Sequence, residues 1–409
     1  EYTYSEGFPY GFSCEVVDGG TADILASLSK DIQKDAGEKE VTRNSFFDLL
    51  STDINSFEIE TVLSEDDYRL LRYSFDCGKK ENLMACIALY NALEKDGKNK
   101  NLEELDAEDV SILASNNVDI LKTVPGFYNI QISSVSDSNP IYIPHSAPVS
   151  KNGEFMQTEK IFNLIEQIAE FSENAVLCLS YFGDPLFHKD LSKIVEKILS
   201  YPGLSVFIET DYISEESADV LRNVALKAES RTNGYEKIMI SINLDSFTSE
   251  KYAKIRGKTE ADFEKAVQGV KNAATCFPSS VYPQFIRMNE NEEELESFFR
   301  YWNEKSNSSN GNFIIQKYNS FCGLIPDRKP ADLSPVERNV CWHLRRDMNI
   351  LVNGDVTFCH SCFNKVVGNV FTETLEKIWN QNNTEIMNHI NKTYCDKCGK
   401  CDEYYTFHF

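Results

Sequence analysis

Apolar and polar residues alternate in long, regular blocks between about residue 127 and residue 318. Short apolar runs, which predict buried strands, are separated by segments with apolar residues three and four positions apart, which predict amphipathic helices. The predicted strands are 127–134, 175–182, 204–210, 237–245, 280–288 and 312–318, and the predicted helices between them are 158–171, 189–202, 215–228, 261–275 and 292–304.

Strands that alternate with helices in this way form parallel βαβ units. Six strands and five helices predict an α/β core, either an open doubly wound sheet or part of a (βα) barrel. In both architectures the functional groups lie at the carboxyl ends of the strands. The segments on either side of this core differ from it. The first hundred or so residues are acidic and mixed, and the chain from about Asp332 onward is rich in cysteine.

Composition narrows the class of partner. The chain has 409 residues, enough for two or three domains, and 41 basic against 64 acidic residues give a net charge of −23. A surface this acidic repels nucleic acid and anionic membranes, so we expect neither as a partner.

The sequence contains no apolar run of about 18 residues that would predict a transmembrane helix, and we expect a cytoplasmic protein. The chain begins at Glu1, so we expect it to be part of a longer protein. Composition does not predict its oligomeric state.

Six of the twelve cysteines fall between residues 341 and 401. In a chain of this size, such clustering favours one metal site in a reducing compartment over a disulfide framework, which is typical of small secreted domains. The apolar runs around the turn NGD at 353–355 predict a hairpin, which would return Cys359 to the end at which Cys341 lies.

Converging thiolates bind either a tetrahedral zinc ion or an iron–sulfur cluster. The pairs Cys359-x-x-Cys362 and Cys395-x-x-Cys398 have a spacing that is also typical of zinc sites, although 32 residues separate them. Spacing alone therefore leaves both kinds of metal site open.

The arrangement Cys-x12-Gly-x4-Cys, followed by GNVFTETLEKIWN and a terminal Cys-x-x-Cys, resembles a SPASM domain, the auxiliary iron–sulfur module of radical S-adenosylmethionine (SAM) enzymes. The ending CDEYYTF at 401–407 is similar to that of the spiro-SPASM proteins of spirochaetes. The resemblance implies one [4Fe–4S] cluster. Its implied ligands are Cys341, Cys359, Cys398 and Cys401, and Cys362 and Cys395 are extra thiols that could each serve as the fourth ligand instead.

This resemblance predicts three parts. Residues 121–330 would form a partial (β/α)6 barrel like that of radical SAM enzymes, and residues 331–409 the SPASM domain. In residues 1–120, the segments 1–17 and 40–50 resemble the second half of cytidylyltransferase-like domains of the sugar-nucleotide type, and 57–75 would match their later strand and helix. The glycine-rich nucleotide loop of those domains is absent from the sequence, so we expect a scaffold rather than nucleotide transfer.

A radical SAM barrel holds its SAM-cleaving cluster with Cys-x3-Cys-x2-Cys after the first strand. In the loop VSDSNPIYIPHS, the corresponding positions hold Ser136, Pro140 and Ile143, none of which offers a thiolate. His145 in the same loop cannot replace three thiolates, and Cys178 on the next strand is most simply a core cysteine. We therefore expect a barrel that cannot cleave SAM, and we assign no catalytic residue.

The rest of the barrel also resembles the family. Gly183, Asp184 and Pro185 stand where relatives receive the amino group of SAM, but the same residues are typical of a strand-to-helix turn capped by Asp. The resemblance also implies that Ser241 and Asp245 face the cofactor region. Without the open iron, SAM loses its strongest anchor, so its binding is left open.

Together these patterns predict an iron–sulfur protein with an accessory, binding or electron-relay role, whose partner is a peptide or protein substrate or a redox partner. Two alternatives remain open. One is a working radical SAM or cytidylyltransferase-type enzyme. The other is a structural zinc protein, whose ligands would be Cys359, Cys362, Cys395 and Cys398.

Overall fold

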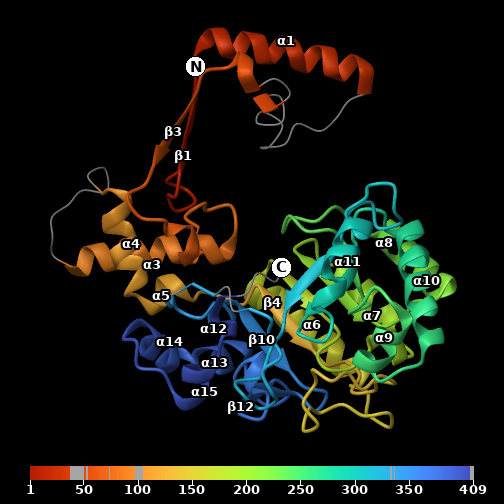
Figure 1. The fold of residues 1–409 in the computed structure, drawn as a ribbon. Helices are drawn as coiled ribbons and strands as arrows, with labels where there is room; N and C mark the ends of the chain where they lie inside the picture. Colours follow the sequence, from red (N-terminus) through yellow and green to blue (C-terminus); the bar gives the residue numbers. More distant parts are fainter. Residues whose placement is uncertain are drawn as a thin grey trace. The chain divides into compact units, whose positions relative to one another are not determined.

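The computed structural model describes residues 1–36, 50–51, 54–72, 74–96, 105–331, 334–335 and 337–405. The chain forms two compact units (Figure 1). The first contains residues 1–78 and 82–121, and the second contains residues 79–81 and 122–409. No helix among the described residues is both long enough and apolar enough to cross a membrane.

The first unit is built on a three-stranded sheet in the order β2-β1-β3. Strand β1 (Tyr2–Glu6) pairs parallel to β3 (Ile59–Leu63) and antiparallel to β2 (Glu15–Val17). The strand predicted within 57–75 is thus confirmed as β3, whereas the prediction for 40–50 lies outside the described residues except at position 50. The other elements are α1 (Gly19–Ala36), η1 (Ile54–Ser56), η2 (Tyr68–Leu71), α4 (Ala107–Ser115), α5 (Val118–Leu121) and most of α3 (Lys80–Asp96).

The second unit contains a nine-stranded sheet in the order β12-β11-β10-β4-β5-β6-β7-β8-β9. Six of its strands, β4 to β9, are parallel and follow one another in chain order, which confirms the predicted α/β core. They are β4 (Phe127–Ile130), β5 (Ala175–Cys178), β6 (Leu204–Thr210), β7 (Ile238–Asn243), β8 (Val281–Arg287) and β9 (Ile314–Lys317).

Helices surround the outer face of these strands (Figure 1). The five predicted helices are confirmed as α6 (Thr158–Ser172), α7 (Leu191–Leu199), α8 (Glu215–Lys227), α10 (Glu260–Cys276) and α11 (Leu295–Trp302). Helix α9 (Ser249–Arg256) was not predicted, because Tyr252 and Ile255 are its main apolar contacts and one such pair gives no periodic signal. Short 3-10 helices occur at η4 (Pro185–Phe187) and η5 (Glu292–Glu294).

The two faces of the parallel strands differ. Outward-facing residues such as Ile130, Leu177 and Ile240 pack against the helices in the main core. A smaller apolar cluster, which includes Phe127, Phe207 and Met239, packs separately from that core. Apolar residues therefore pack on both faces of the parallel strands.

The carboxyl-terminal segment continues the sheet. Strand β10 (Asp347–Ile350) pairs parallel to β4 and antiparallel to β11 (Asp355–Thr357), which confirms the predicted hairpin and joins it to the barrel. Strand β12 (Val366–Asn369) completes this edge. The remaining elements are α12 (Trp342–Arg346), η6 (His360–Cys362), α13 (Leu375–Asn380), α14 (Asn383–Ile390), α15 (Asp396–Lys400) and η7 (Glu403–Tyr405).

Candidate functional site

A cavity of about 820 Å³ lies at the carboxyl ends of the parallel strands. Strands β4 to β9 each contribute residues to its wall, and the carboxyl-terminal segment contributes His343, Asp347, His360 and Glu403. The cavity is therefore enclosed between the mouth of the barrel and the cysteine-rich segment. This is the position at which parallel α/β folds bind their ligands.

Polar side chains from neighbouring strands line the barrel side of this cavity. Gln284 Nε2 donates to Asn243 Oδ1 at 2.8 Å and to Glu209 Oε1 at 3.3 Å. Burial raises the pKa of Glu209 above its usual value. The wall is thus a hydrogen-bonded layer that offers amide and carboxyl groups to a polar ligand.

The loop that follows β4 brings the three positions of the expected cluster motif together. Ser136, Pro140 and Ile143 all line the cavity. The Ile143 amide donates to the Pro140 carbonyl at 3.1 Å, and the Ser136 hydroxyl lies 3.1 Å from that of Ser138. Cys178 is the one cysteine in the cavity wall, and burial raises the pKa of its thiol to about 12. His145 is exposed.

This loop is fixed to the end of α9. The amides of Asn139 and Ile141 donate to the carbonyls of Arg256 and Ile255 at 3.0 and 2.9 Å. Gly257 follows with a φ of +64°, and a Cβ at this position would lie 2.7 Å from the Asn139 carbonyl oxygen. The close approach of the two backbones therefore requires glycine at this position.

A buried charged network stands behind the loop. Arg256 contacts Asp211 and the Tyr142 hydroxyl, and its Nη1 lies 2.9 Å from Asp245 Oδ2. Tyr142 Oη donates to the same carboxylate oxygen at 2.7 Å. Burial alone would raise the pKa of Asp211, but the charges of Arg256 and Lys258 hold it below its usual value. The network is therefore charged, compact and largely removed from water.

The residues predicted to contact SAM lie in two places. Gly183 and Asp184 line the cavity, whereas Pro185 begins η4 behind it. Ser241 and Asp245 are buried behind the wall, where Ser241 Oγ donates to Gln284 Oε1 and Asp245 Oδ1 accepts from the Ile286 amide. In these positions Ser241 and Asp245 support the wall of the cavity rather than line it.

Asp184 both lines the cavity and caps the helix that follows its turn. Its Oδ1 caps η4 by accepting from the Leu186 amide at 2.9 Å, and its Oδ2 accepts from Thr210 Oγ1 at 2.6 Å. Burial raises the pKa of its carboxyl to about 7. A Cβ on the neighbouring Gly183 would lie 1.9 Å from the Ser133 carbonyl oxygen, so the turn requires glycine at this position.

The six cysteines of the carboxyl-terminal segment lie at the ends of short helices or within them. Cys341 precedes α12 and Cys359 precedes η6, in which Cys362 lies. Cys395, Cys398 and Cys401 begin, lie within and end α15. Three short helices and the residues that flank them therefore carry all six thiols.

The thiols are close enough to affect one another. Burial raises the pKa of Cys359 well above its usual value, and the neighbouring thiols of Cys401, Cys341 and Cys362 raise it further. Burial, with contributions from Cys395, Cys359 and Cys341, likewise raises the pKa of Cys398. Such a group cannot hold several thiolates without a bound cation, so its chemistry fits a metal centre.

A seventh cysteine, which sequence reasoning did not identify, belongs to the same group. Cys322 is buried in the loop after β9 and has a φ of +57°. A hydrogen bond from its thiol lowers the pKa of Cys401 to about 7. Eighteen residues separate Cys322 from Cys341, and no Cys-x-x-Cys pair includes it, so spacing gives no signal for it.

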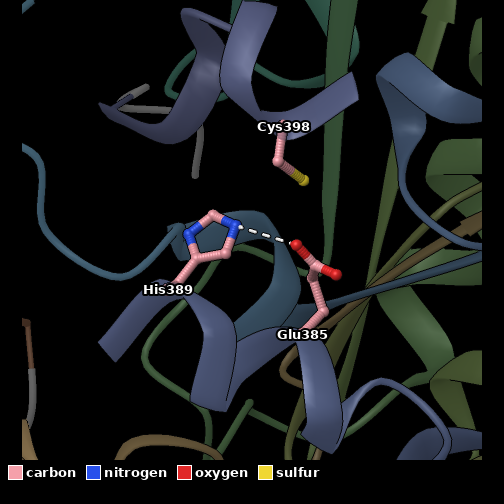
Figure 2. Close-up of side chains that lie close together, drawn as sticks. All are labelled: Glu385, His389 and Cys398. Carbon is pink, nitrogen blue, oxygen red and sulfur yellow. Dashed lines mark ion pairs between the residues drawn. The ribbon is translucent and has the colours of Figure 1, made fainter. Parts of the chain in front are cut away.

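Glu385 and His389 on α14 also face this region, and neither was predicted. Figure 2 shows both side chains with Cys398. His389 Nε2 lies 3.8 Å from Glu385 Oε1, and burial lowers the pKa of the imidazole to about 4. The Cys341 amide donates to His389 Nδ1 at 3.4 Å. Two polar residues four positions apart on a helix usually face solvent, so the sequence pattern did not indicate that this pair belongs to a site.

Comparison with known proteins gives three results. A family model for SPASM, described as an iron–sulfur cluster-binding domain, matches residues 341–402. An uncharacterised protein of Treponema pallidum is 36% identical over 370 residues, which span 89% of this chain and 98% of that protein. A probable GTP 3′,8-cyclase of Methanosarcina mazei is 28% identical over 152 residues, which span 36% of this chain and 41% of the cyclase.

The fold also matches a solved structure. The crystal structure of SuiB from Streptococcus suis superposes with a TM-score of 0.50 at 11% sequence identity, and the match covers 97% of this chain and 91% of that chain. Similarity at this level concerns the fold alone. The matched family model spans residues 341–402, so it includes all six of the predicted cysteines and begins after Cys322.

Proposed function

Because the chain belongs to the radical SAM/SPASM superfamily, we propose that it is an iron–sulfur protein whose barrel has lost the SAM-cleaving cluster. Its carboxyl-terminal domain would hold one [4Fe–4S] cluster and serve a binding, accessory or electron-relay role. The observation that carries this proposal is the distribution of thiols, which are abundant beside the cavity on one side and absent from the three motif positions on the other.

The proposed cluster ligands are Cys341, Cys359, Cys398 and Cys401. Support comes from their burial and mutual influence, since four thiolates are the usual ligands of such a cluster. Cys322, Cys362 and Cys395 would then be neighbouring thiols.

The spread of the thiols also favours a cluster over a single ion. Thiolates on one tetrahedral zinc ion lie roughly 3.8 Å apart, as bonds of about 2.3 Å require. All twelve cysteines lie in the described part of the chain, and no three of their sulfur atoms come within 4.8 Å of one another. A cubane, whose corners are occupied by separate iron atoms, suits this wider spacing better than one ion does.

Loss of the SAM-cleaving cluster is supported by the loop itself. Ser136, Pro140 and Ile143 face the cavity together, so their placement resembles that of a cluster loop while their side chains offer no thiolate. Arg256 and Tyr142 fill the space behind the loop with a charged network of their own. The side chains of Ser136, Pro140 and Ile143 would therefore provide no thiolate ligand for a cluster at this position.

We also propose a role for each of the three parts of the chain. Residues 121–330 would form the degenerate barrel and residues 331–409 the cluster-binding domain, with residues 1–120 as a nucleotidyltransferase-like scaffold. The cavity joins the first two, because His360, which follows Cys359, and Glu403, whose amide donates to Cys401 Sγ at 3.4 Å, both line it. A peptide or redox partner bound in this cavity would therefore lie beside the cluster.

One experiment tests the proposal as a whole. The chain is purified and reconstituted without oxygen, and its iron, sulfide and zinc contents are measured together with its electron paramagnetic resonance spectrum. We expect about four iron atoms per chain and no release of 5′-deoxyadenosine from SAM under a strong reductant. About eight iron atoms, or formation of 5′-deoxyadenosine, would show an intact second cluster, and a colourless zinc protein would contradict the cluster assignment.

A further inference from the structure

Glu385, His389 and Cys398 direct their ligand atoms toward one another inside the carboxyl-terminal domain (Figure 2). A carboxylate oxygen, an imidazole nitrogen and a thiol sulfur all lie within 4.8 Å of one another, the one such trio found in the described part of the chain. Glu385 and His389 are four residues apart, so one turn of α14 places them on the same face. Cys398 reaches the same point from α15.

His389 is the informative member of this trio. Its Nε2 is buried and has no hydrogen-bond partner, and the distance of 3.8 Å to Glu385 Oε1 is too long for a hydrogen bond. His389 is 3% exposed, and Glu385 and Cys398 are each 8% exposed. Buried polar atoms in native proteins nearly always have a partner, so an unpartnered nitrogen that faces a carboxylate and a thiol indicates a missing ligand.

We propose that Glu385, His389 and Cys398 form a second metal site, which holds one divalent transition-metal ion of the Zn²⁺ class when the domain lacks its cluster. Thiolate, imidazole and carboxylate together are a ligand set for zinc and its neighbours, and they discriminate against Ca²⁺ and Mg²⁺, which prefer oxygen alone. Three protein ligands and one water complete a tetrahedral site.

The charges of this site balance. A carboxylate and a thiolate carry two negative charges, which a dication neutralises in this buried region. Binding releases the proton of the Cys398 thiol to solvent. It also requires the imidazole proton to be on Nδ1, so the Cys341 amide gives up its contact with that nitrogen. This contact is 3.4 Å long, so its loss is a weak opposing effect.

The inference rests on the proposed function at one point, because Cys398 is also a proposed cluster ligand. One thiolate cannot serve both occupants in the same way, so the ion and the cluster exclude each other. The site also differs from the zinc site that spacing alone left open, whose ligands would be Cys359, Cys362, Cys395 and Cys398. The two share Cys398, and the new site takes Glu385 and His389 in place of three cysteines.

Titration of the cluster-free chain with Co²⁺ under anaerobic conditions tests the inference. Co²⁺ reports thiolate ligation by an intense charge-transfer band, and added Zn²⁺ displaces it. We expect one equivalent to bind. His389→Ala and Glu385→Gln should each weaken binding by at least about tenfold, and Cys398→Ser should remove the charge-transfer band. His145→Ala and Glu376→Gln, which change an exposed histidine and an exposed glutamate, are the matched controls and should bind as the unaltered chain does.

Two further measurements distinguish the loss of a metal ligand from misfolding of the variant. His389→Ala and Glu385→Gln should still take up about four iron atoms on reconstitution, as a folded cluster-binding domain does. His389→Cys supplies a different metal ligand at the same point and should restore Co²⁺ binding. If His389→Ala and Glu385→Gln bind Co²⁺ as tightly as the unaltered chain, the ion lies elsewhere and the inference is wrong.

The two proposals fail in distinguishable ways. A chain that takes up four iron atoms but no Co²⁺ contradicts the second site and leaves the cluster proposal intact. A chain that binds one Co²⁺ on these residues but never assembles a cluster contradicts the proposed function alone. Competition is tested on the reconstituted chain, which should bind Co²⁺ at least about tenfold more weakly than the cluster-free chain. Undiminished binding would overturn the sharing of Cys398.

Discussion

Arg256 and Asp245 form an ion pair that is enclosed at the mouth of the barrel. Arg256 Nη1 lies 2.9 Å from Asp245 Oδ2, and the two side chains are 4% and 0% exposed. Asp245 also accepts a hydrogen bond from Tyr142, which lies in the loop that would carry a SAM-cleaving cluster. The loop is therefore held in place by charge and hydrogen bonding, with no need for a bound cluster.

The first prediction concerns this ion pair. Arg256→Met leaves Asp245 and Asp211 buried with one fewer positive charge, so it should lower the free energy of unfolding by roughly 3–5 kcal/mol. Equilibrium unfolding in urea measures the change. Arg300→Met, which removes an exposed arginine, is the matched control and should change stability by less than about 0.5 kcal/mol. A small effect of Arg256→Met would mean that water or another group reaches these carboxylates.

The second prediction separates ligands from neighbouring thiols. Serine in place of Cys341, Cys359, Cys398 or Cys401 should reduce iron content from about four atoms per chain to near zero, because serine is a poor ligand for this cluster. The same change at Cys362, Cys395 or Cys322 should preserve it. Iron and sulfide analysis after anaerobic reconstitution measures both groups of variants.

The outcome at Cys322 is of particular interest, because its thiol contacts that of Cys401. Loss of iron in Cys322→Ser, with iron retained in one of the four proposed ligand variants, would reassign the fourth ligand. Loss of iron in all seven variants would mean that the assay reports folding rather than ligation.

The third prediction tests the loop after β4. The variant S136C/P140C/I143C places three thiols at positions that line the same cavity, so it should raise iron content from about four to about eight atoms per chain. The matched control S138C/P140C/I143C moves one thiol by two residues and should not bind the additional iron. Unchanged iron in a folded S136C/P140C/I143C variant would show that the alignment of this loop with the family motif is wrong.

The sequence predicted the parallel core well, because its signals are local. Runs such as 204–210 and the helix pattern at 158–171 need only a few neighbouring residues to be recognised, and they match β6 and α6 to within a residue. The pairing of β10 with β4 depends on residues 220 positions apart, such as Phe127 and Asp347, and no local pattern reports it.

The candidate site was predictable to the same extent. Spacing identified the six cysteines between 341 and 401, because they are close together in the sequence and include Cys-x-x-Cys pairs. Cys322, Glu385 and His389 come to the same region only through the tertiary fold, so a linear pattern could not include them. Ser241 and Asp245, which the resemblance implies face the cofactor region, hydrogen-bond to Gln284 and to the Ile286 amide, and their role toward a cofactor stays a prediction.

The last prediction is a dependence of stability on pH that originates at Asp184. Burial raises the pKa of this carboxyl from an ordinary value of 3.8 to about 7 in the folded chain. Between about pH 4 and pH 7 the folded chain therefore keeps a proton that the unfolded chain releases. The free energy of unfolding should fall as pH rises across this interval, by up to roughly 4 kcal/mol. Asp184→Asn cannot ionise and should lack this contribution.

Urea unfolding at several pH values between 4 and 7.5, with Asp184→Asn compared to the unaltered chain, measures this difference. The matched control is Asp190→Asn. Hydrogen bonds from Lys193 and Thr158 lower the pKa of Asp190, so its contribution has the opposite sign and is lost as pH falls. If Asp184→Asn and the unaltered chain keep a constant difference over the whole range, Asp184 is ionised in the folded chain. A solvated or cation-bound carboxylate would then face the cavity, in place of the protonated group inferred from its burial.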